Sequence, residues 1–426
     1  MKSLSVSMEI SGKQKKVGQI TGSSAADAFF SYSDEYLQDS SAVPLSISLP
    51  LTGKAFSPVQ TQNFFDGLLP EGFTRRCVAG QLLRDERDYL SILSGLGNEC
   101  LGAIQISEPG NPPPVPEYRA LNLDEIRDLA RNGAEGSAEL LARSHISLTG
   151  ASGKTGLYYD EQNRKWYLPA GSAPSTHIVK QSHVRLNGII ANEQLCQLTA
   201  RGLGIDTPQS FIIQAGGQND ADILFATRRY DRLFTVNPES INGLPVPRRL
   251  HQEDFAQALG IPAFRKYEPK GESYLKKMFD LLRECSADPI ADQEKLWDRC
   301  VFNFLIGNSD AHLKNFSILY SENLHTLQLA PAYDILSTAV YENSTRDLSL
   351  GIAGKYSIDD ISRKDFEREA AHLGLGVRMA MKRFDHLAEN FESALNEAAE
   401  TLRAEGFNRI QSLKNDILLQ GGIHSL

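Results

Sequence analysis

Cysteine is scarce in this sequence, and its spacing matches neither a disulfide framework nor a metal motif. The chain has five cysteines, an odd number, with no C-x-x-C pair. Widely separated thiols of this kind argue against a zinc site and fit a protein of the reducing cytoplasm. The five are Cys77, Cys100, Cys196, Cys285 and Cys300.

Long apolar runs are also missing. Residues 1–7 (MKSLSVS) alternate apolar with polar side chains and contain no apolar core of a secretion signal. No stretch approaches the ~18 apolar residues that a membrane-spanning helix needs. We therefore predict a cytoplasmic protein with no membrane partner.

An excess of positive charge is absent as well. The net charge is −9 over 426 residues, with 41% hydrophobic and 23% charged residues, which is ordinary for a globular protein. The chain as a whole is therefore no electrostatic surface for nucleic acid, and a contact with DNA would need a local basic patch or a separate partner. A chain of this length predicts two or three domains.

A proline-rich run divides the chain. Residues 109–116 (PGNPPPVP) suit neither a helix nor a central strand, so we place a linker at 109–117. Before it, alternating apolar patterns and turn signals predict an N-terminal α+β domain over 1–108. Its predicted elements include a strand at 45–51, helices near 58–69 and 86–95, and a strand at 102–106.

The order of elements after the linker matches the two lobes of a protein kinase. A β-rich small lobe is predicted over 118–232 and a mainly α-helical large lobe over 233–426. The predicted fold class is α+β, a bilobal protein-kinase-like fold preceded by the N-terminal α+β domain. The small lobe is predicted to contain strands at 155–159, 165–168, 176–180, 211–214 and 223–227 and a helix near 192–203. The large lobe is predicted to contain helices at 252–259, 273–284, 292–306, 364–372 and 376–404.

Two short segments of the predicted large lobe carry the residues that phosphoryl transfer needs. They are 307–315 (GNSDAHLKN) and 331–335 (PAYDI). In a kinase, one carboxylate accepts the proton of the substrate hydroxyl, while an Asn and a second carboxylate hold the Mg²⁺ that bridges the phosphates of ATP. We assign Asp310 as the general base, and Asn315 and Asp334 as magnesium ligands.

Single residues in these segments allow other interpretations. Asp310 and Asn315 are common in turns, so the first segment alone is compatible with a structural surface loop. Lys314 either touches the γ-phosphate or is a solvated loop lysine, and His312 either contacts a phosphate or packs the loop. The downstream Asp334 and the lobe order favour the functional interpretation. The predicted nucleotide-binding residues here are His312, Leu313, Lys314, Asn315, Tyr333 and Asp334.

A small-residue loop and a lysine follow one another as in a kinase small lobe. Lys180 ends a predicted strand and is expected to pair with the α- and β-phosphates, the alternative being a solvated lysine at a strand end. Glu193, on the next helix, would orient Lys180, although the helix dipole also favours an acid there. The residues predicted to cradle the phosphates are Thr149, Gly150, Ala151, Ser152, Gly153 and Lys154.

This loop is not a P-loop. That motif needs a glycine where Leu148 stands, and it opens a helix, whereas residues 155–159 have the pattern of a strand. Backbone N–H groups of the loop are still able to cradle a phosphate.

A charged segment ends the last strand of the predicted small lobe, where a kinase hinge presents backbone groups to adenine. We expect Arg228, Arg229 and Tyr230 to contact the nucleotide, with the tyrosine ring packing on the base. The alternative is a charged domain junction.

Six ordered motifs together resemble the HipA family of bacterial serine/threonine kinase toxins. Two further segments, 46–50 (SISLP) and 64–70 (FFDGLLP), resemble the amino-terminal domain of that family, so the likeness covers nearly the whole chain. It departs at Arg228, where the family often has Glu, so a side-chain contact to adenine would be lost there and a backbone contact kept. The six motifs are 147–151 (SLTGA), 176–180 (THIVK), 229–232 (RYDR), 251–255 (HQEDF), 307–315 (GNSDAHLKN) and 333–335 (YDI).

The resemblance implies a toxin of a toxin–antitoxin pair that phosphorylates glutamate–tRNA ligase, inhibits translation and promotes dormancy and persistence. It implies a dimeric HipB-like helix-turn-helix antitoxin, with which the kinase acts as co-repressor on operator DNA and is nucleoid-associated. It also implies autophosphorylation of Ser147, because a phosphate beside the nucleotide loop brings charge and bulk that would disable the site.

Two other functions stay open from the residues. One is a kinase of similar lobe order that phosphorylates a small molecule, which the amino-terminal domain disfavours. The other is a catalytically silent co-repressor, which the presence of Asp310, Asn315, Asp334 and Lys180 disfavours.

Overall fold

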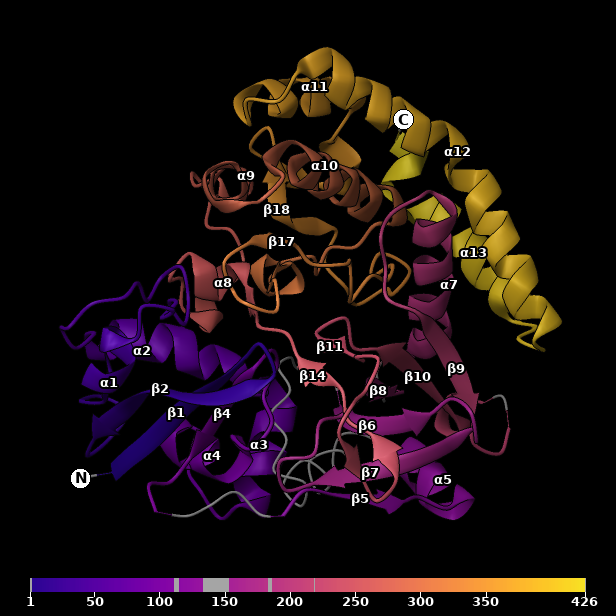
Figure 1. Ribbon diagram of the computed structural model, residues 1–426. Coiled ribbons are helices and arrows are strands. Elements are labelled where there is room, and N and C mark those ends of the chain that lie inside the picture. The colour runs from indigo at the N-terminus through magenta and orange to yellow at the C-terminus, as the bar shows by residue number, and fades with distance from the viewer. Residues whose placement is uncertain (1, 111–114, 133–152, 183–185, 218, 426) are drawn as a thin grey trace. The chain divides into compact units, whose positions relative to one another are not determined.

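The computed structural model describes residues 2–110, 115–132, 153–182, 186–217 and 219–425 (Figure 1). These residues form two compact units, each built from segments that are distant in the sequence. The first unit comprises Met1–Arg185, Ile213–Ala263 and Leu319–Thr326. The second unit comprises Leu186–Ile212, Phe264–Ile318 and Leu327–Leu426.

A four-stranded antiparallel sheet near the N-terminus is built on the alternation seen in the sequence. Every second side chain of β1 (Lys2–Ile10) is buried from Leu4 onwards. β1 turns into β2 (Lys13–Gly22) through Ser11 and Gly12, whose φ values of 51° and 75° fit a two-residue hairpin turn. The sheet order is β3-β2-β1-β4, with β3 at Phe29–Tyr32 and β4 at Ile104–Ser107. Its helices are α1 (Asp34–Gln38), α2 (Pro58–Phe65), α3 (Gly72–Gln81) and α4 (Tyr89–Leu96) (Figure 1).

A six-stranded sheet follows, with the strand order β5-β7-β6-β8-β10-β9. Neighbouring strands from β5 to β10 run antiparallel, which matches the strand-rich small lobe that the sequence predicts. The elements are β5 (Glu117–Ala120), α5 (Leu123–Arg131), β6 (Lys154–Asp160), β7 (Lys165–Ala170), β8 (His177–Gln181), β9 (Ser210–Gln214) and β10 (Ile223–Arg228). Short strands come next: β11 (Arg232–Leu233), β12 (Ser240–Ile241), β13 (Leu244–Pro245), β14 (Arg248–Arg249) and β15 (Gln252–Asp254).

Two local predictions are wrong in the first unit. Residues 45–51, predicted as a strand, form a turn with an isolated bridge between Ser46 and Leu49. The helix predicted over 252–259 begins instead as a strand, β15, and only α8 (Phe255–Ala258) is helical.

Contacts with distant segments accompany both differences: β15 pairs with a distant strand of the chain in a three-stranded sheet, and the Glu253 side chain holds the turn at residues 46–47. Its buried carboxylate accepts hydrogen bonds from the Ser46 hydroxyl (2.5 Å), from the Ile47 N–H (3.1 Å) and from the Tyr320 hydroxyl. These partners lie far from Glu253 in the sequence, so a tertiary contact overrides the local pattern of each segment.

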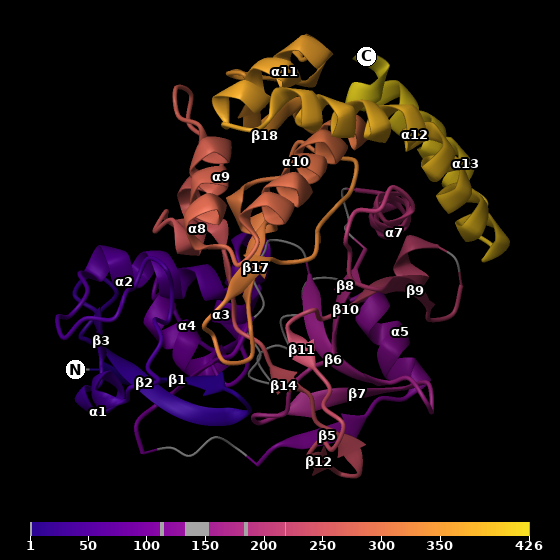
Figure 2. The same ribbon diagram turned by 45° about the horizontal axis from the view of Figure 1, so that its top comes forward.

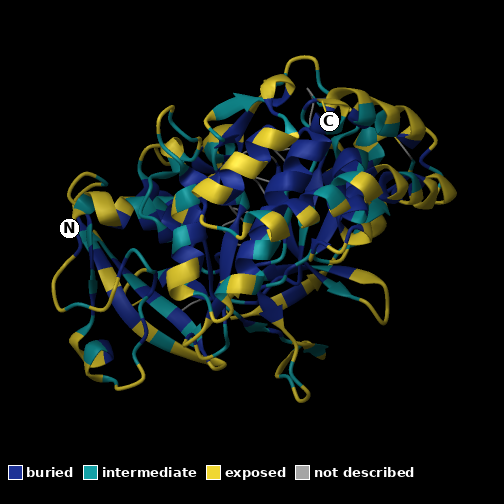
Figure 3. Ribbon diagram, turned by 90° about the horizontal axis from the view of Figure 1, so that it is seen from above, coloured by how far each residue is buried: buried dark blue, intermediate teal, exposed yellow. Residues whose placement is uncertain are grey.

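The second unit is mainly helical. α10 (Pro289–Ile306) packs on α12 (Val377–Ala404), and the Trp297 indole N–H donates to the Ala380 carbonyl at 2.8 Å (Figure 2). The ring of Phe366 lies between them, 5.8 Å from Trp297 and 4.8 Å from Phe384 by centroids. Helices of this unit bury one side and expose the other (Figure 3). The remaining helices are α7 (Ile189–Gly202), α9 (Tyr274–Cys285), α11 (Arg363–His372) and α13 (Ile410–Gln420).

Short strands complete the architecture, and sequence patterns did not predict them. They are β16 (Ser317–Tyr320), β17 (Leu327–Leu329), β18 (Asp347–Ile352) and β19 (Lys355–Ser357). Within the described part of the chain, no helix combines the length and apolarity needed to cross a bilayer.

Glu253 generates a prediction about stability and pH. Burial raises its pKa to about 7, although hydrogen bonds from Ser46 and Tyr320 act in the opposite direction. Because the folded-state pKa lies above the unfolded value, the carboxyl contributes stability at low pH that is lost as the pH rises through about 7. We expect Glu253→Gln to remove this pH dependence of the unfolding free energy, which amounts to a total change on the order of 3 kcal/mol. Urea unfolding at one pH well below 7 and at one pH well above 7 measures the change.

The exposed Glu35→Gln is the matched control, because it deletes the same charge without a buried partner. If Glu253→Gln retains the pH dependence of the parent protein, this role of Glu253 is wrong.

Candidate active site

Gly307 joins the two segments in which the sequence predicts catalytic residues. It ends α10 with a φ of 68°, as expected from the sequence, and a Cβ at this position would lie 2.7 Å from the Ala339 Cβ. Its carbonyl accepts the N–H groups of Thr338 (3.2 Å) and Ala339 (3.0 Å) and also the Thr338 hydroxyl (3.1 Å). The start of segment 307–315 is therefore bonded to the end of segment 331–339.

The loop around Asp310 is held by side-chain amides. The Asn308 amide donates to the Asn303 side-chain oxygen at 3.0 Å, and the Asp310 N–H donates to the Asn308 side-chain oxygen at 3.2 Å. The Asn315 amide donates to the Asp310 carbonyl at 2.9 Å. The backbone on both sides of Asp310 is thus fixed, while the Asp310 side chain is exposed. An exposed carboxylate on a fixed backbone is suited to accept a proton from an incoming hydroxyl.

Asn315 and Asp334 line one small pocket, together with Asn308 and Tyr333. Asp334 has a φ of 52°, in the left-handed region that residues other than glycine adopt at a cost. Backbone strain of this kind is common at functional sites, and the strained residue Asp334 is one of those that line the pocket.

This pair of oxygen-bearing side chains fits a magnesium ion. Mg²⁺ prefers hard oxygen ligands and is commonly bound by one or two carboxylates plus the phosphates of the substrate. The described residues include no cluster of three His, Cys, Asp or Glu side chains, so a closed all-protein metal cage is not seen among them. Asn315 and Asp334 are therefore suited to an ion that arrives with a nucleotide.

The three residues that precede Asn315 in the loop are buried. Lys314 and His312 are each 5% exposed and Leu313 is fully buried. The Tyr333 hydroxyl donates to the Lys314 carbonyl at 2.9 Å, so the two segments are tied together a second time. The alternative in which Lys314 is a solvated loop lysine is wrong, because its side chain lies inside the fold.

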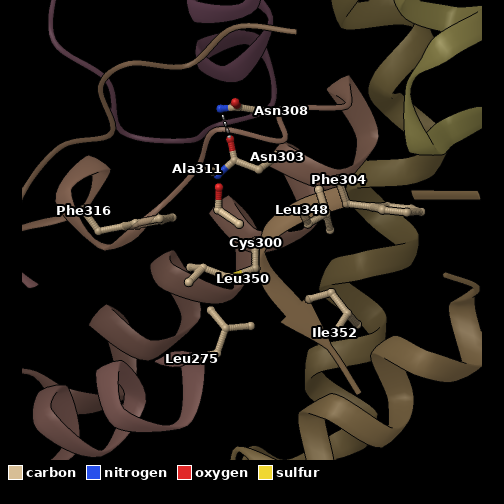
Figure 4. A pocket seen from close by; sticks show the side chains of 11 residues that line it. Leu275, Cys300, Asn303, Phe304, Asn308, Ala311, Phe316, Leu348, Leu350 and Ile352 are labelled. Atoms are coloured by element: carbon tan, nitrogen blue, oxygen red, sulfur yellow. Dashed lines mark hydrogen bonds between the residues drawn. The ribbon is translucent and has the colours of Figure 1, made fainter. Parts of the chain in front are cut away.

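A second small cavity, shown in Figure 4, shares Asn303, Asn308 and Ala311 with the first pocket. Asn303 and Asn308 reach it from one side, and apolar side chains such as Leu275, Leu350 and Ile352 close the other. This lining is mainly apolar and holds no carboxylate, so it supports the loop and does not extend the site.

In the first unit, two lysines of the predicted phosphate site face each other. Lys154 on β6 is the direct antiparallel partner of Lys180 on β8, and each is 7% exposed. The Lys180 ammonium lies 5.5 Å from the ring centroid of Phe225, its partner on β10. The strand β6 begins at Lys154, so this lysine follows the loop as a strand residue and not as part of a helix. That agrees with the rejection of a P-loop.

Part of the predicted loop lies outside the described residues. These residues are Ser147, Thr149, Gly150, Ala151 and Ser152. Gly153 is described and buried, and its carbonyl accepts the Gln181 N–H at 3.2 Å.

The predicted hinge is tied to the N-terminal segment by buried ion pairs. The Arg229 guanidinium, fully buried, bonds the Glu99 carboxylate at 3.1 Å and the Asp231 carboxylate at 2.7 Å. Arg232 bonds the same two carboxylates at 2.9 and 3.0 Å. Burial alone would raise the pKa of Glu99, but Arg232 and Arg229 lower it overall. This network of Glu99, Arg229, Asp231 and Arg232 is called the buried charge cluster below.

The cluster leaves the hinge residues with different roles. The Arg229 side chain is committed to the cluster and its N–H donates to the Thr176 carbonyl at 2.8 Å. Arg228 is partly exposed and lies 3.6 Å from Glu161, and the Tyr230 hydroxyl donates to Gln252. A side-chain contact from Arg229 to a nucleotide is therefore excluded in this conformation, whereas a backbone contact from the segment to adenine stays a prediction.

Glu193 lies on α7, in the second unit, and is 4% exposed. Its neighbour Asn192 anchors α7 to the segment after Asp334, since its amide donates to the Ser337 carbonyl (2.8 Å) and its oxygen accepts the Ser337 N–H (2.9 Å). The pairing of Glu193 with Lys180 stays a prediction.

Sequence patterns missed two side chains that bear on the site. Glu99 has no local feature that marks it as a partner of Arg229. Tyr267 is the other, and its hydroxyl donates to Asp310 Oδ1 at 2.8 Å. Both contacts join residues far apart in the chain, so local spacing contains no signal for them.

The element order and the chemistry of the loop define a protein of the protein-kinase-like class. The model of the HipA-like C-terminal domain matches residues 146–395 and that of the HipA N-terminal domain matches residues 8–107, so the chain belongs to the HipA family.

Similar proteins agree with this family. The chain is 33% identical to "Putative kinase Y4mE" of Sinorhizobium fredii over 90% of both chains. It is 25% identical to the serine/threonine-protein kinase toxin HipA of Shewanella oneidensis, over 89% of this chain and 86% of the other. A solved structure of HipA from the Shewanella oneidensis complex of HipA, HipB and operator DNA superposes with a TM-score of 0.80. It has 22% identity and covers 97% of this chain and 96% of that one, which confirms the predicted fold class.

The buried charge cluster generates a prediction about folding. Glu99→Gln leaves two buried arginines facing the single carboxylate of Asp231. Removal of one partner from a buried ion pair costs about 3–5 kcal/mol, because the remaining charge has no water to solvate it. We expect a loss of unfolding free energy of this size, measured by urea denaturation. Glu35→Gln, on the surface, is expected to change stability by less than about 0.5 kcal/mol, and equal effects of the two substitutions would contradict the assignment.

Proposed function

We propose that the chain is a serine/threonine protein kinase that transfers the γ-phosphate of ATP to a protein hydroxyl. The observation that carries the proposal is that Asn315, whose amide bonds the Asp310 carbonyl, lines one small pocket together with Asp334. Three groups of these types are what phosphoryl transfer needs: one proton acceptor and two oxygen ligands for a magnesium ion.

In the proposed reaction Asp310 accepts the proton of the acceptor hydroxyl. The hydroxyl oxygen forms a bond to the γ-phosphorus, the bond from that phosphorus to the bridging oxygen breaks, and ADP leaves. Asn315 and Asp334 would hold Mg²⁺, which would supply positive charge to the phosphates. The contacts of the Asp310 backbone fix the point in the loop from which its carboxylate reaches the hydroxyl.

Lys154 and Lys180 are proposed to bind the phosphates. They are direct partners on neighbouring strands and carry two ammonium groups. An ammonium group is a common binder of phosphate, so a polyphosphate is the class of ligand that this pair suits. Gly153 and the residues before it are proposed to add backbone N–H groups, and the backbone of Arg228, Arg229 and Tyr230 to contact adenine.

The biological role is proposed from the family. The Shewanella oneidensis relative is a kinase toxin whose structure was solved with HipB and operator DNA. We propose that this chain acts in the cytoplasm as a toxin that promotes persistence. A HipB-like antitoxin dimer would bring it to operator DNA as co-repressor, which suits a chain with a net charge of −9. Glutamate–tRNA ligase is the proposed substrate, and Ser147 the proposed site of self-inactivation.

Mass spectrometry after incubation with Mg²⁺ and ATP tests the enzyme. We expect phosphate on Ser147 and on added glutamate–tRNA ligase with the parent protein. Asp310→Asn should lower the rate by ~10²–10⁴, because the general base is lost, while ATP binding remains. Absence of phosphate in every sample, starting from unphosphorylated protein, would refute the kinase and leave the silent co-repressor as the function to test.

The two lysines generate a separate prediction about nucleotide affinity. Lys154→Met and Lys180→Met keep the aliphatic length and delete the charge. A hydrogen bond to a charged group contributes about 1.5–3 kcal/mol, so each substitution should weaken ATP binding by roughly 10-fold or more. Isothermal titration calorimetry with ATP and Mg²⁺ measures this. Lys54→Met, at an exposed lysine, is the control, and an unchanged affinity in both lysine variants would remove them from the site.

A further inference from the structure

Tyr267 contacts the proposed general base directly. Its hydroxyl donates a hydrogen bond to Asp310 Oδ1 at 2.8 Å, and its side chain is 49% exposed. A carboxylate has two oxygens with about four acceptor sites, so one hydrogen bond uses only part of its accepting capacity. The assignment that follows rests on the proposed kinase function.

The backbone that carries Tyr267 is firmly anchored by the next residue. The half-buried Glu268 carboxylate accepts the Tyr274 N–H at 2.6 Å, the Gly351 N–H at 3.1 Å and the Tyr356 hydroxyl at 2.9 Å. These bonds join the start of α9 to β18 and β19. On the other side of Tyr267, the Lys266 carbonyl accepts the Leu313 N–H at 3.3 Å.

One residue of β18 ties this backbone to the loop of Asp310. The Ser349 carbonyl accepts the Glu268 N–H at 3.0 Å, and the Ser349 hydroxyl donates to the Ser309 carbonyl at 2.5 Å. Glu268 follows Tyr267, and Ser309 precedes Asp310. The separation between the tyrosine and the aspartate is therefore set by the scaffold and not by their own contact alone.

The ring of Tyr267 is held as well. Its centroid lies 5.1 Å from that of His312, at 86°, an edge-on arrangement. The Lys266 ammonium lies 5.4 Å from the same ring centroid. Contacts of both kinds stabilise one rotamer of an aromatic ring. The hydroxyl is thus presented to Asp310 by a side chain with little freedom to move.

We propose that Tyr267 is a positioning residue, which orients the Asp310 carboxylate for proton transfer from the acceptor hydroxyl. Asp310 is exposed, and a rotation about its side-chain bonds would move the accepting oxygen away from the substrate. A misplacement of about 1 Å costs on the order of 10² in rate, so a bond that fixes one oxygen has a kinetic effect. The tyrosine acts through Asp310 and takes no part in phosphate binding.

Tyr267→Phe tests the role, because it deletes one oxygen and retains the ring that packs on His312. We expect kcat for phosphorylation of the protein acceptor to fall by roughly 10-fold to 10², with the KM and Kd for ATP unchanged. In the Asp310→Asn background the same substitution should cause no further loss, since the hydroxyl acts through the carboxylate. Thermal unfolding of the variant should match that of the parent protein, and Tyr167→Phe, on β7, is the control for the chemical change.

The possible outcomes separate the positioning role of Tyr267 from the proposed kinase function. A Tyr267→Phe enzyme with kcat within twofold of the parent, a rise in KM for ATP, or an equal loss in the Asp310→Asn background overturns the positioning role and leaves the kinase standing. A parent protein that transfers no phosphate to Ser147 or to a protein acceptor overturns the proposed function and this role with it.

Discussion

The candidate active site depends on one backbone group, the carbonyl of Gly307. It accepts three hydrogen bonds from Thr338 and Ala339. These bonds join the start of the segment that carries Asp310 to the end of the segment that carries Asp334. The left-handed φ of Gly307 makes this possible, and the nearby Ala339 leaves no room for a side chain there. The bond from the Asn315 amide to the Asp310 carbonyl and the bond from the Tyr333 hydroxyl to the Lys314 carbonyl add further ties within and between these segments.

The first unit is organised by a different interaction, the buried charge cluster. Glu99 comes from the N-terminal segment, whereas Arg229, Asp231 and Arg232 come from the predicted hinge. Four charges without access to water are stable only when their geometry satisfies each of them. The motif RYDR, which first suggested an adenine contact, is therefore also a folding element. Its two arginine side chains hold the N-terminal segment through Glu99.

Local patterns succeeded where one segment determines its own structure. The alternation in β1, the apolar stripe of α12 and the glycine that ends α10 all appear in the structure as the sequence predicts. They failed at residues 45–51, which hydrogen-bond to the distant Glu253 side chain, and at 252–254, which pair with β16 in a sheet. Lys314 illustrates the same limit, since a lysine in a polar loop has the composition of a surface residue and is nevertheless buried.

The sequence by itself determined which chemical groups are available and in what order: Lys180, then Asp310, Asn315 and Asp334, with spacings that indicate phosphoryl transfer. It also determined the family, because whole motifs were present together. Only the tertiary structure decided which groups act on one another. The pairing of Glu99 with Arg229, of Lys154 with Lys180 and of Tyr267 with Asp310 joins residues that no periodicity connects. Such contacts depend on where distant backbones meet, and that is settled by the packing of the whole unit.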